Sequence, residues 1–268
     1  EPMSISYQED FKECADIKFI SKLSGKSEKV EVALVAEVTR QSNMYLANLN
    51  IMFSELGFDI YEILGQRNLS GFVGEVFVRS FSRIVDGFRN NPHADGRPDL
   101  LDISANVAET FLKNECFNAD GMPVRSFLAP FKYGGIEVKC TIGTPVHDHK
   151  KKLQELHGVK NFEIGMPRIN FLKSLTYWGH HTSCENLLGV YYDYVAEHEG
   201  VPQIMMIMHS ELEVETDWNA VSIGKKGSKK TSNTSLTKPA RDKLLNKIVV
   251  IANSKVYIDR ISGIGGNI

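Results

Sequence analysis

Two short segments of the chain carry side chains suited to the hydrolysis of a phosphodiester. Pro98-Asp99 follows a turn-rich stretch, and Glu137-Val138-Lys139 lies in a segment where apolar and polar residues alternate. Hydrolysis needs a divalent cation near the phosphate, a water made nucleophilic, and a balance for the charge that grows on the phosphate. Mg²⁺ prefers oxygen ligands and usually takes only one or two carboxylates. Asp99 and Glu137 therefore predict a Mg²⁺ site, provided that their strands are neighbours.

Lys139 is the third residue of this predicted active site. In a β-strand, residues two apart project from the same face, so its ammonium group would lie beside Glu137. There it could orient or deprotonate the attacking water, or stabilise the charged phosphate. Ile136, Val138 and Cys140 would bury the opposite face of the strand. The alternative is an ordinary half-exposed strand whose Glu and Lys face water.

Hydrophobic periodicity predicts the elements that would position these residues. Helices are expected over 29–55 and after Ser70, which we interpret as an N-cap. Strands are expected over 99–103 and 135–142, with a helix over 104–116 between them. The later elements predicted are a polar helix from 145 to 157, buried strands over 187–195 and 203–209, a helix near 239–246 and a strand over 247–259.

Helices and strands mix along the chain, without an internal repeat or a clear linker. We therefore predict an α/β fold, with a central mixed β-sheet flanked by helices. A length of 268 residues suits a single domain over 1–268. Within it, a helical N-terminal region of about residues 1–90 would precede a catalytic sheet core of about residues 97–260.

The motif Pro98-Asp99 with Glu137-Val138-Lys139 resembles that of the PD-(D/E)xK nuclease superfamily, and within it the type II restriction endonucleases. The order helix, Asp strand, E-x-K strand, helix, strand is also similar. The spacing of 38 residues from Asp99 to Glu137 is longer than the commonest pattern and requires an insertion over 104–134. The resemblance implies a restriction-endonuclease-like fold, Mg²⁺ dependence, and cleavage of double-stranded DNA by a homodimer that matches a palindromic site.

Two further carboxylates lie near the motif. Glu75 is a candidate metal ligand, because many members of this superfamily have a glutamate on the preceding helix that points into the site. The alternative is a surface ion pair between Glu75 and Arg79, one helical turn later. Asp102, three residues after Asp99, would face the other way in a strand, which favours a structural role.

Cationic residues elsewhere are candidates for DNA binding, since phosphate contacts are the main source of affinity for DNA. Lys150 lies in the predicted polar helix, where an ordinary solvated face is the alternative. Arg168 and Lys173 could instead bind base edges in the major groove. A Gly/Ser/Thr-rich loop over 224–238 could wrap a duplex, or could be a soluble surface loop; its lysines are Lys225, Lys226, Lys229 and Lys230.

Composition excludes several other classes of protein. A net charge of −2 argues against a generally basic nucleic-acid coat, although it does not exclude a local basic surface. Four cysteines without a CxxC pair indicate reduced thiols, and His180, His181 and Cys184 match no structural zinc pattern. No apolar run approaches the length of a membrane span, and the first residues lack the order of a signal peptide. We therefore expect a cytoplasmic protein without a membrane partner.

Three functions remain open at this point. The first is a sequence-specific type II restriction endonuclease. The second is a structure-specific repair or recombination nuclease of the same fold. The third is a non-catalytic DNA-binding or assembly module, in which Glu137 and Lys139 are only a solvated strand face. The first two require Asp99, Glu137 and Lys139 to converge in space.

Overall fold

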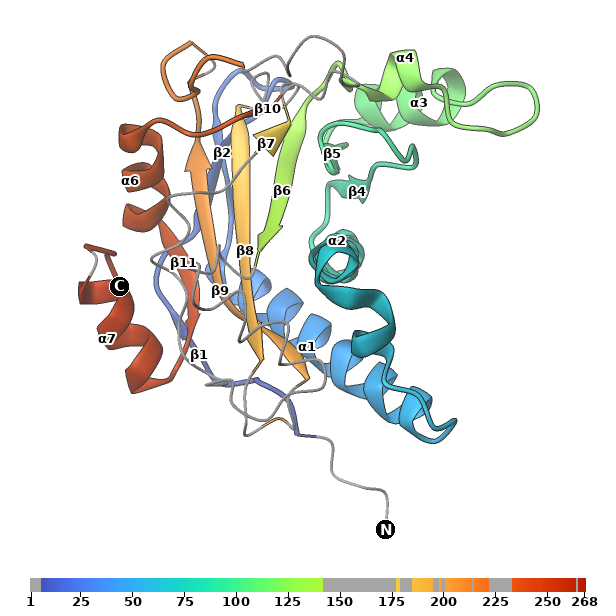
Figure 1. The fold of residues 1–268 in the computed structure, drawn as a ribbon. Coiled ribbons are helices and arrows are strands. Elements are labelled where there is room, and N and C mark those ends of the chain that lie inside the picture. The colour runs from blue at the N-terminus through green and yellow to red at the C-terminus, as the bar shows by residue number, and fades with distance from the viewer. Residues whose placement is uncertain are drawn as a thin grey trace, which may run out of the picture.

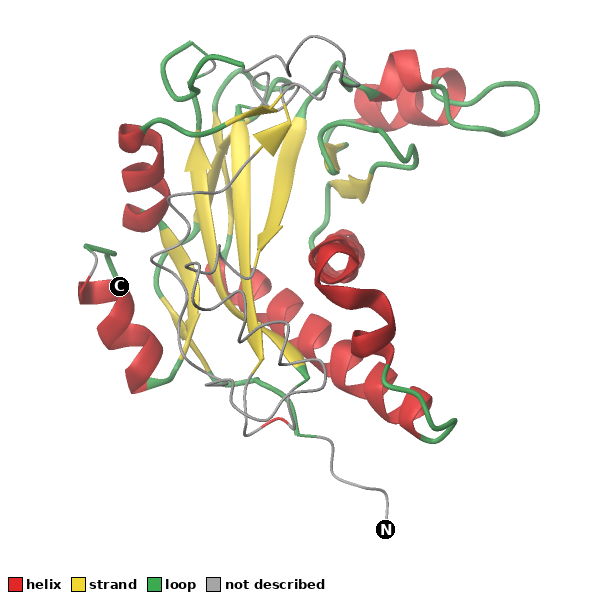
Figure 2. Cartoon of the chain, viewed as in Figure 1, coloured by secondary structure: helices red, strands yellow, loops and turns green. Residues whose placement is uncertain are grey.

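The structure is a computed structural model. It describes residues 6–141, 177–178, 185–194, 198, 201–213, 215–221, 233–263 and 265–268. Within this part of the chain, a central β-sheet is flanked by helices (Figures 1 and 2).

The described elements divide into one large sheet, two small sheets and helices. The strands of the large sheet are β1 (Phe11–Glu13), β4 (Phe88–Asn90), β5 (Leu100–Asp102), β6 (Gly135–Thr141), β8 (Asn186–Tyr194), β9 (Pro202–Glu211) and β11 (Ile248–Ala252). The small sheets pair β2 (Ile17–Ile20) with β3 (Ser27–Val30), and β7 (Tyr177–Trp178) with β10 (Asn233–Thr234). The helices are α1 (Val32–Ser54), α2 (Ile60–Ile84), α3 (Asn106–Glu115), α4 (Arg125–Leu128), α6 (Lys238–Asn246) and α7 (Lys255–Gly263).

The large sheet is mixed, and its strand order is β1-β11-β9-β8-β6-β5-β4. β6 runs parallel to β8, whereas the other neighbouring strands are antiparallel. β8 and β9 are buried along nearly their whole length, as their continuous apolar runs predicted. The expected α/β class and mixed central sheet are therefore confirmed.

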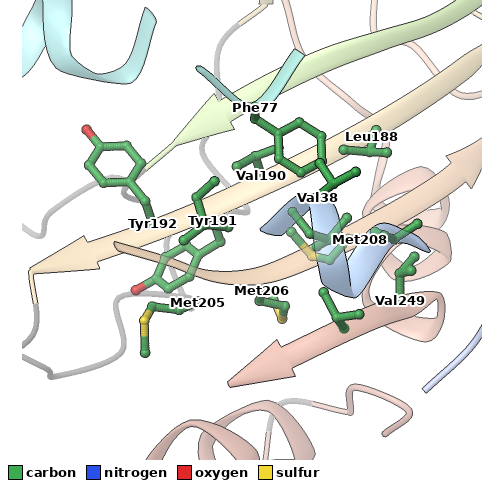
Figure 3. Close-up of a cluster of buried hydrophobic side chains, with 14 of the residues drawn as sticks. Val38, Phe77, Leu188, Val190, Tyr191, Tyr192, Met205, Met206, Met208 and Val249 are labelled. Atoms are coloured by element: carbon green, nitrogen blue, oxygen red, sulfur yellow. The ribbon is translucent and has the colours of Figure 1, made fainter. Parts of the chain in front are cut away.

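The core lies where α1 and α2 pack against each other and against the sheet. Val38 on α1 and Phe77 on α2 gather with Leu188 and Val190 of β8 and Met208 of β9 (Figure 3). α6 and α7 pack against β9 and β11, on the left of the sheet in Figure 1, with α2 on the right. This packing holds β6 and its neighbours in a fixed position.

The start of α2 differs from the expectation. We expected Ser70 to cap the helix, but α2 begins at Ile60, so Ser70 lies in its middle. The Ser70 hydroxyl lies 2.9 Å from the hydroxyl of Tyr192 on β8. Leu69 is fully buried, so tertiary packing extends the helix upstream of the predicted cap.

The expectation of one long strand over 247–259 is also wrong. β11 ends at Ala252, and α7 begins at Lys255. Tyr257 and Ile261 are both buried and lie four residues apart, which is a helical spacing. The polar residues Asn253 and Ser254 separate the strand from the helix, and the period of the apolar residues changes there from two to nearly four.

The N-terminal region, which we expected to be helical, contributes strands as well. β1 joins the edge of the large sheet, where Phe11 pairs with Ala252 of β11. β2 and β3 form a hairpin whose outward-facing residues are polar except for Ile20. These strands have three or four residues each, so they are too short to show a clear alternating pattern.

The insertion over 104–134 forms a hydrophobic cluster of its own. α3 occupies most of the range predicted for it, and α4 is a single added turn. The rings of Phe111, Phe131 and Tyr133 pack together, and Leu101 of β5 and Leu128 of α4 complete the cluster. α3 and α4 project beside β5 and β6 at the upper right of Figure 1. The insertion is thus a compact unit attached to the strand that follows Asp99.

Two expectations fall on other parts of the chain. The polar helix expected over 145–157 lies outside the described residues, as does most of the loop over 224–238. Among the described helices, none has both the length and the apolar character needed to cross a membrane.

Candidate active site

Asp99 and Glu137 face each other across two paired strands. β5 and β6 are antiparallel, with Leu100 opposite Ile136 and Leu101 opposite Gly135. The same register, continued by one residue, sets Asp99 opposite Glu137. The strands that carry the two carboxylates are therefore neighbours, as the predicted site required.

Backbone hydrogen bonds fix both carboxylates. Asp99 Oδ2 accepts a hydrogen bond from the backbone N–H of Val138, at 2.8 Å. The backbone N–H of Asp99 in turn hydrogen-bonds the Glu137 carboxylate. A carboxylate has about four lone-pair sites, so these bonds leave capacity for a cation. The two acids are thus held at one place by the strands themselves.

A cavity of about 600 Å³ lies at this place, between α2, the loop before β5, and β6. Asp99, Glu137 and Lys139 all line it, together with Glu75 from α2. The four predicted catalytic and metal-binding residues therefore share one cavity. The remaining lining residues are Ser70, Gly71, Gly74, Val78, Ala94, Asp95, Gly96, Arg97, Arg125, Val138 and Cys140.

Glu137 is a buried carboxylate, with only 6 % of its surface exposed. Burial raises its pKa from 4.5 to about 7, because the charged form loses hydration. The positive charge of Arg97, the Asp99 N–H and the charge of Lys139 act in the opposite direction. A cation in the cavity would favour the ionised form, so the energetic cost of this burial fits a ligand-binding role.

Lys139 is largely buried as well, and this burial lowers the pKa of its ammonium group. Cys140, Glu137 and Asp99 partly offset the effect electrostatically. A lysine with a lowered pKa is a better proton acceptor at neutral pH than an exposed one. Glu137 and Lys139 therefore differ from the solvated pair of a half-exposed strand.

The opposite face of β6 is buried only in part as the alternation predicted. Ile136 is fully buried, whereas Val138 and Cys140 are partly buried: they pack against the main core and also line the cavity. α2 comes close to this strand at Gly74, where a Cβ atom would lie 3.2 Å from the Cys140 Cβ. A small residue at this position lets the helix form one wall of the cavity.

Glu75 forms the ion pair expected as the alternative, and its role as a metal ligand stays a prediction. Its side chain lines the cavity, yet it is 65 % exposed and lies 3.6 Å from Arg79 Nε on the next helical turn.

Asp102 has the structural surroundings expected for it. It is fully buried and accepts hydrogen bonds from the hydroxyls of Ser21 and Ser104, at 2.8 and 2.6 Å.

Two arginines in the cavity were absent from the candidates derived from the sequence. Arg97 immediately precedes Pro98-Asp99, and Arg125 comes from α4 in the insertion. The sequence could have indicated Arg97 as a cavity residue only through its position next to the Pro98-Asp99 motif. Nothing in the sequence indicates that Arg125 returns to the cavity, since this depends on how the insertion folds.

The cavity brings together two carboxylates that could hold a cation, those of Asp99 and Glu137. Among the described residues, no three His, Cys, Asp or Glu side chains are grouped to hold a metal ion. Mg²⁺ commonly takes only one or two carboxylates from the protein. Mg²⁺ binding at this cavity stays a prediction.

The candidate DNA-binding residues derived from the sequence lie outside the described residues. They are Lys150, Arg168, Lys173, Lys225, Lys226, Lys229 and Lys230. The same is true of His180, His181 and Cys184. Their contribution to DNA binding therefore stays a prediction.

The case for a function rests on the residues and geometry of this cavity. No protein-family model, curated protein or solved structure matches the chain.

Proposed function

We propose that this protein is a Mg²⁺-dependent endonuclease that cuts double-stranded DNA at a specific short sequence, as type II restriction endonucleases do. The observation that carries the proposal is the convergence of Asp99, Glu137 and Lys139 on one cavity, from two strands in direct register. The restriction-endonuclease-like arrangement of the fold belongs to the same proposal. So does a homodimer, which would present two such cavities to the two strands of a palindromic site.

In this proposal, Asp99 and Glu137 hold the cation through their carboxylate oxygens. A bound Mg²⁺ would supply positive charge at the phosphate and lower the pKa of a water molecule. Lys139 lies on the same strand face as Glu137 and accepts a proton from the attacking water, which its lowered pKa favours. In-line attack on phosphorus would break the bond to the 3′ oxygen, which takes a proton from solvent water, so that the products are a 5′-phosphate and a 3′-hydroxyl.

The burial of Glu137 argues against the non-catalytic alternative. A solvated strand face would leave this carboxylate hydrated, whereas it is 6 % exposed at the wall of a cavity. Burying an acid at neutral pH costs stability unless a ligand compensates it. We therefore place catalysis ahead of a purely structural role.

Digestion of a sequenced plasmid with the purified protein tests the proposal. In Mg²⁺ we expect discrete fragments whose ends map to one short sequence. Asp99→Ala and Lys139→Ala should abolish cutting, while both variants still bind DNA in Ca²⁺. Asp120→Ala and Lys113→Ala are matched controls, because both residues are exposed and lie outside the cavity lining.

Each other outcome of this experiment has a distinct meaning. Cutting only of branched or damaged DNA would favour a structure-specific nuclease. No nicking of any DNA in Mg²⁺ or Mn²⁺ would favour the non-catalytic module. Normal cutting by the Asp99 and Lys139 variants would show that the assigned site is wrong.

A further inference from the structure

Arg97 is held in the wall of the cavity by the insertion over 104–134. Its backbone N–H donates to the carbonyl of Leu128 at 2.8 Å, and its own carbonyl accepts from the N–H of Phe131, also at 2.8 Å. Both backbone groups of Arg97 are therefore bonded to the segment around α4. This places the arginine firmly, one residue before the Pro98-Asp99 motif.

The guanidinium group of Arg97 is only partly satisfied by the protein. One terminal nitrogen, Nη2, donates to the carbonyl of Ala129 at 3.2 Å. Nε is buried, and within the described part of the chain it has no hydrogen-bond partner. A buried donor without an acceptor costs stability, so such a donor needs a reason to persist. An acceptor brought by a ligand would supply one.

The charge of Arg97 acts on the same part of the cavity as the predicted active site. Among the charged side chains that lower the pKa of Glu137, Arg97 has the largest effect, ahead of Lys139. Burial lowers the pKa of the Lys139 ammonium group. Arginine keeps its charge in proteins, so Arg97 is the more permanent cation of the two.

Arg125 is the other arginine of the cavity, and its surroundings are different. It is 64 % exposed and lies 3.8 Å from Asp95. An exposed arginine beside a carboxylate already has a partner for its charge. The geometry therefore favours Arg97 over Arg125 as the anion-binding residue.

We propose that Arg97 binds a phosphate of the DNA backbone inside the cavity, next to the cation held by Asp99 and Glu137. This inference rests on the proposed nuclease function and adds a phosphate-binding residue to it. A guanidinium group is planar and presents parallel N–H donors that match two phosphate oxygens. The insertion over 104–134 is then the part of the fold that orients this group, through the carbonyls of Leu128 and Ala129.

The test measures binding of a short duplex of arbitrary sequence in Ca²⁺, over a range of salt concentrations. We expect Arg97→Gln to weaken binding and to reduce the slope of log K against log salt by about one, as the loss of one phosphate contact would. Arg97→Lys keeps the charge but loses the planar fork. It should restore the slope and still cut more slowly than the wild type in Mg²⁺.

Arg40→Gln is the matched control. Arg40 Nε also donates to a backbone carbonyl, that of Glu9 at 3.0 Å, but Arg40 lies on α1 and does not line the cavity. This variant should keep the wild-type salt slope and the wild-type cutting rate. Thermal unfolding of each variant separates a loss of folding from a loss of binding.

Several results would overturn the proposal. One is that Arg97→Gln keeps the wild-type salt slope and cutting rate. Another is that Arg97→Gln lowers the melting temperature but leaves the salt slope unchanged. A third is that both Arg97 variants unfold; the last two results would assign a structural role to Arg97. DNA binding with an Arg97-dependent slope but no cutting would support the inference and contradict the nuclease function. Absence of DNA binding by the wild type would contradict both.

Discussion

Gly135 lies so close to Leu100 that a Cβ atom at position 135 would be 1.9 Å from the Leu100 carbonyl oxygen. Gly135 also has a φ of +145°, a backbone conformation that L side chains rarely adopt. This approach sets the spacing of β5 and β6 at the point where the two strands begin to pair. The distance between Asp99 and Glu137 therefore depends on the absence of a side chain at position 135.

We predict that Gly135→Ala lowers the free energy of unfolding by about 3 kcal/mol, because steric overlap adds to backbone strain. The variant should also lose DNA cutting, since β5 moves away from β6. Urea unfolding measures the first effect and plasmid digestion the second. Gly121→Ala is the control: its φ is +75°, but the added Cβ meets nothing within 4 Å.

In the control variant Gly121→Ala, backbone strain should therefore lower the free energy of unfolding by only about 1 to 2 kcal/mol, and DNA cutting should be unchanged. Equal losses in the two variants would show that the strands separate easily at position 135. In that case the glycine would not control the geometry of the cavity.

The sequence predicted the parts of the site that depend on local pattern. Alternation over β6 set Glu137 and Lys139 on one face, and the short apolar segment after Asp99 predicted β5. Each of these two features depends only on residues that are close together in the sequence. The register that sets Asp99 opposite Glu137 needed the structure, because the strands are separated by the insertion.

The features that the sequence did not predict depend on distant contacts. Arg97 is positioned by residues 128–131, and Arg125 reaches the cavity through the fold of α3 and α4. Ser70 resembled a helix cap because the apolar residues that extend α2 upstream contact other elements rather than form a local stripe. Propensity and periodicity do not encode such contacts.

We predict that Glu137→Gln stabilises the metal-free protein above neutral pH. The folded-state pKa of Glu137 is raised from 4.5 to about 7, so the protonated acid is the form that the fold favours. The wild type therefore equals the variant below about pH 4.5 and loses stability relative to it as the pH rises through 7. The shift corresponds to a difference of about 3 kcal/mol at most.

Denaturant unfolding in EDTA at several pH values measures this difference. Glu109→Gln is the control with the opposite sign, because a hydrogen bond and ion pair with Lys113 lower the pKa of the partly exposed Glu109. A constant difference between wild type and Glu137→Gln at all pH values would contradict the prediction.

We predict that Asp102→Ala lowers the free energy of unfolding by about 3 kcal/mol, because it leaves the buried Ser21 hydroxyl without its acceptor and removes two hydrogen bonds from the more exposed Ser104. Asp102 joins the turn after β2 to the end of β5, so the effect is on the fold and not on catalysis. Well below its melting temperature, the variant should still cut DNA in Mg²⁺. Complete loss of cutting in a folded Asp102→Ala protein would instead assign this residue to the active site.

We predict that Tyr257→Phe destabilises the protein by about 1 kcal/mol and leaves DNA cutting unchanged. The Tyr257 hydroxyl donates to Asp193 Oδ2 at 3.0 Å, and both residues are buried where α7 meets the sheet. Neither residue lines the cavity. Differential scanning calorimetry and plasmid digestion measure the two quantities, and a loss of activity without a loss of stability would be inconsistent with this assignment.

The pairing of Phe11 with Ala252 has a consequence for biosynthesis. β11 lies between β1 and β9, so the large sheet cannot be completed until a strand made late in translation is inserted between an early strand and a middle one. Closing so long a loop is entropically costly, which delays this step relative to local folding. Asp99, Glu137 and Lys139 are thus synthesised before the strand that completes the sheet supporting them, and the cavity is expected to take its final form only after β11 has been made.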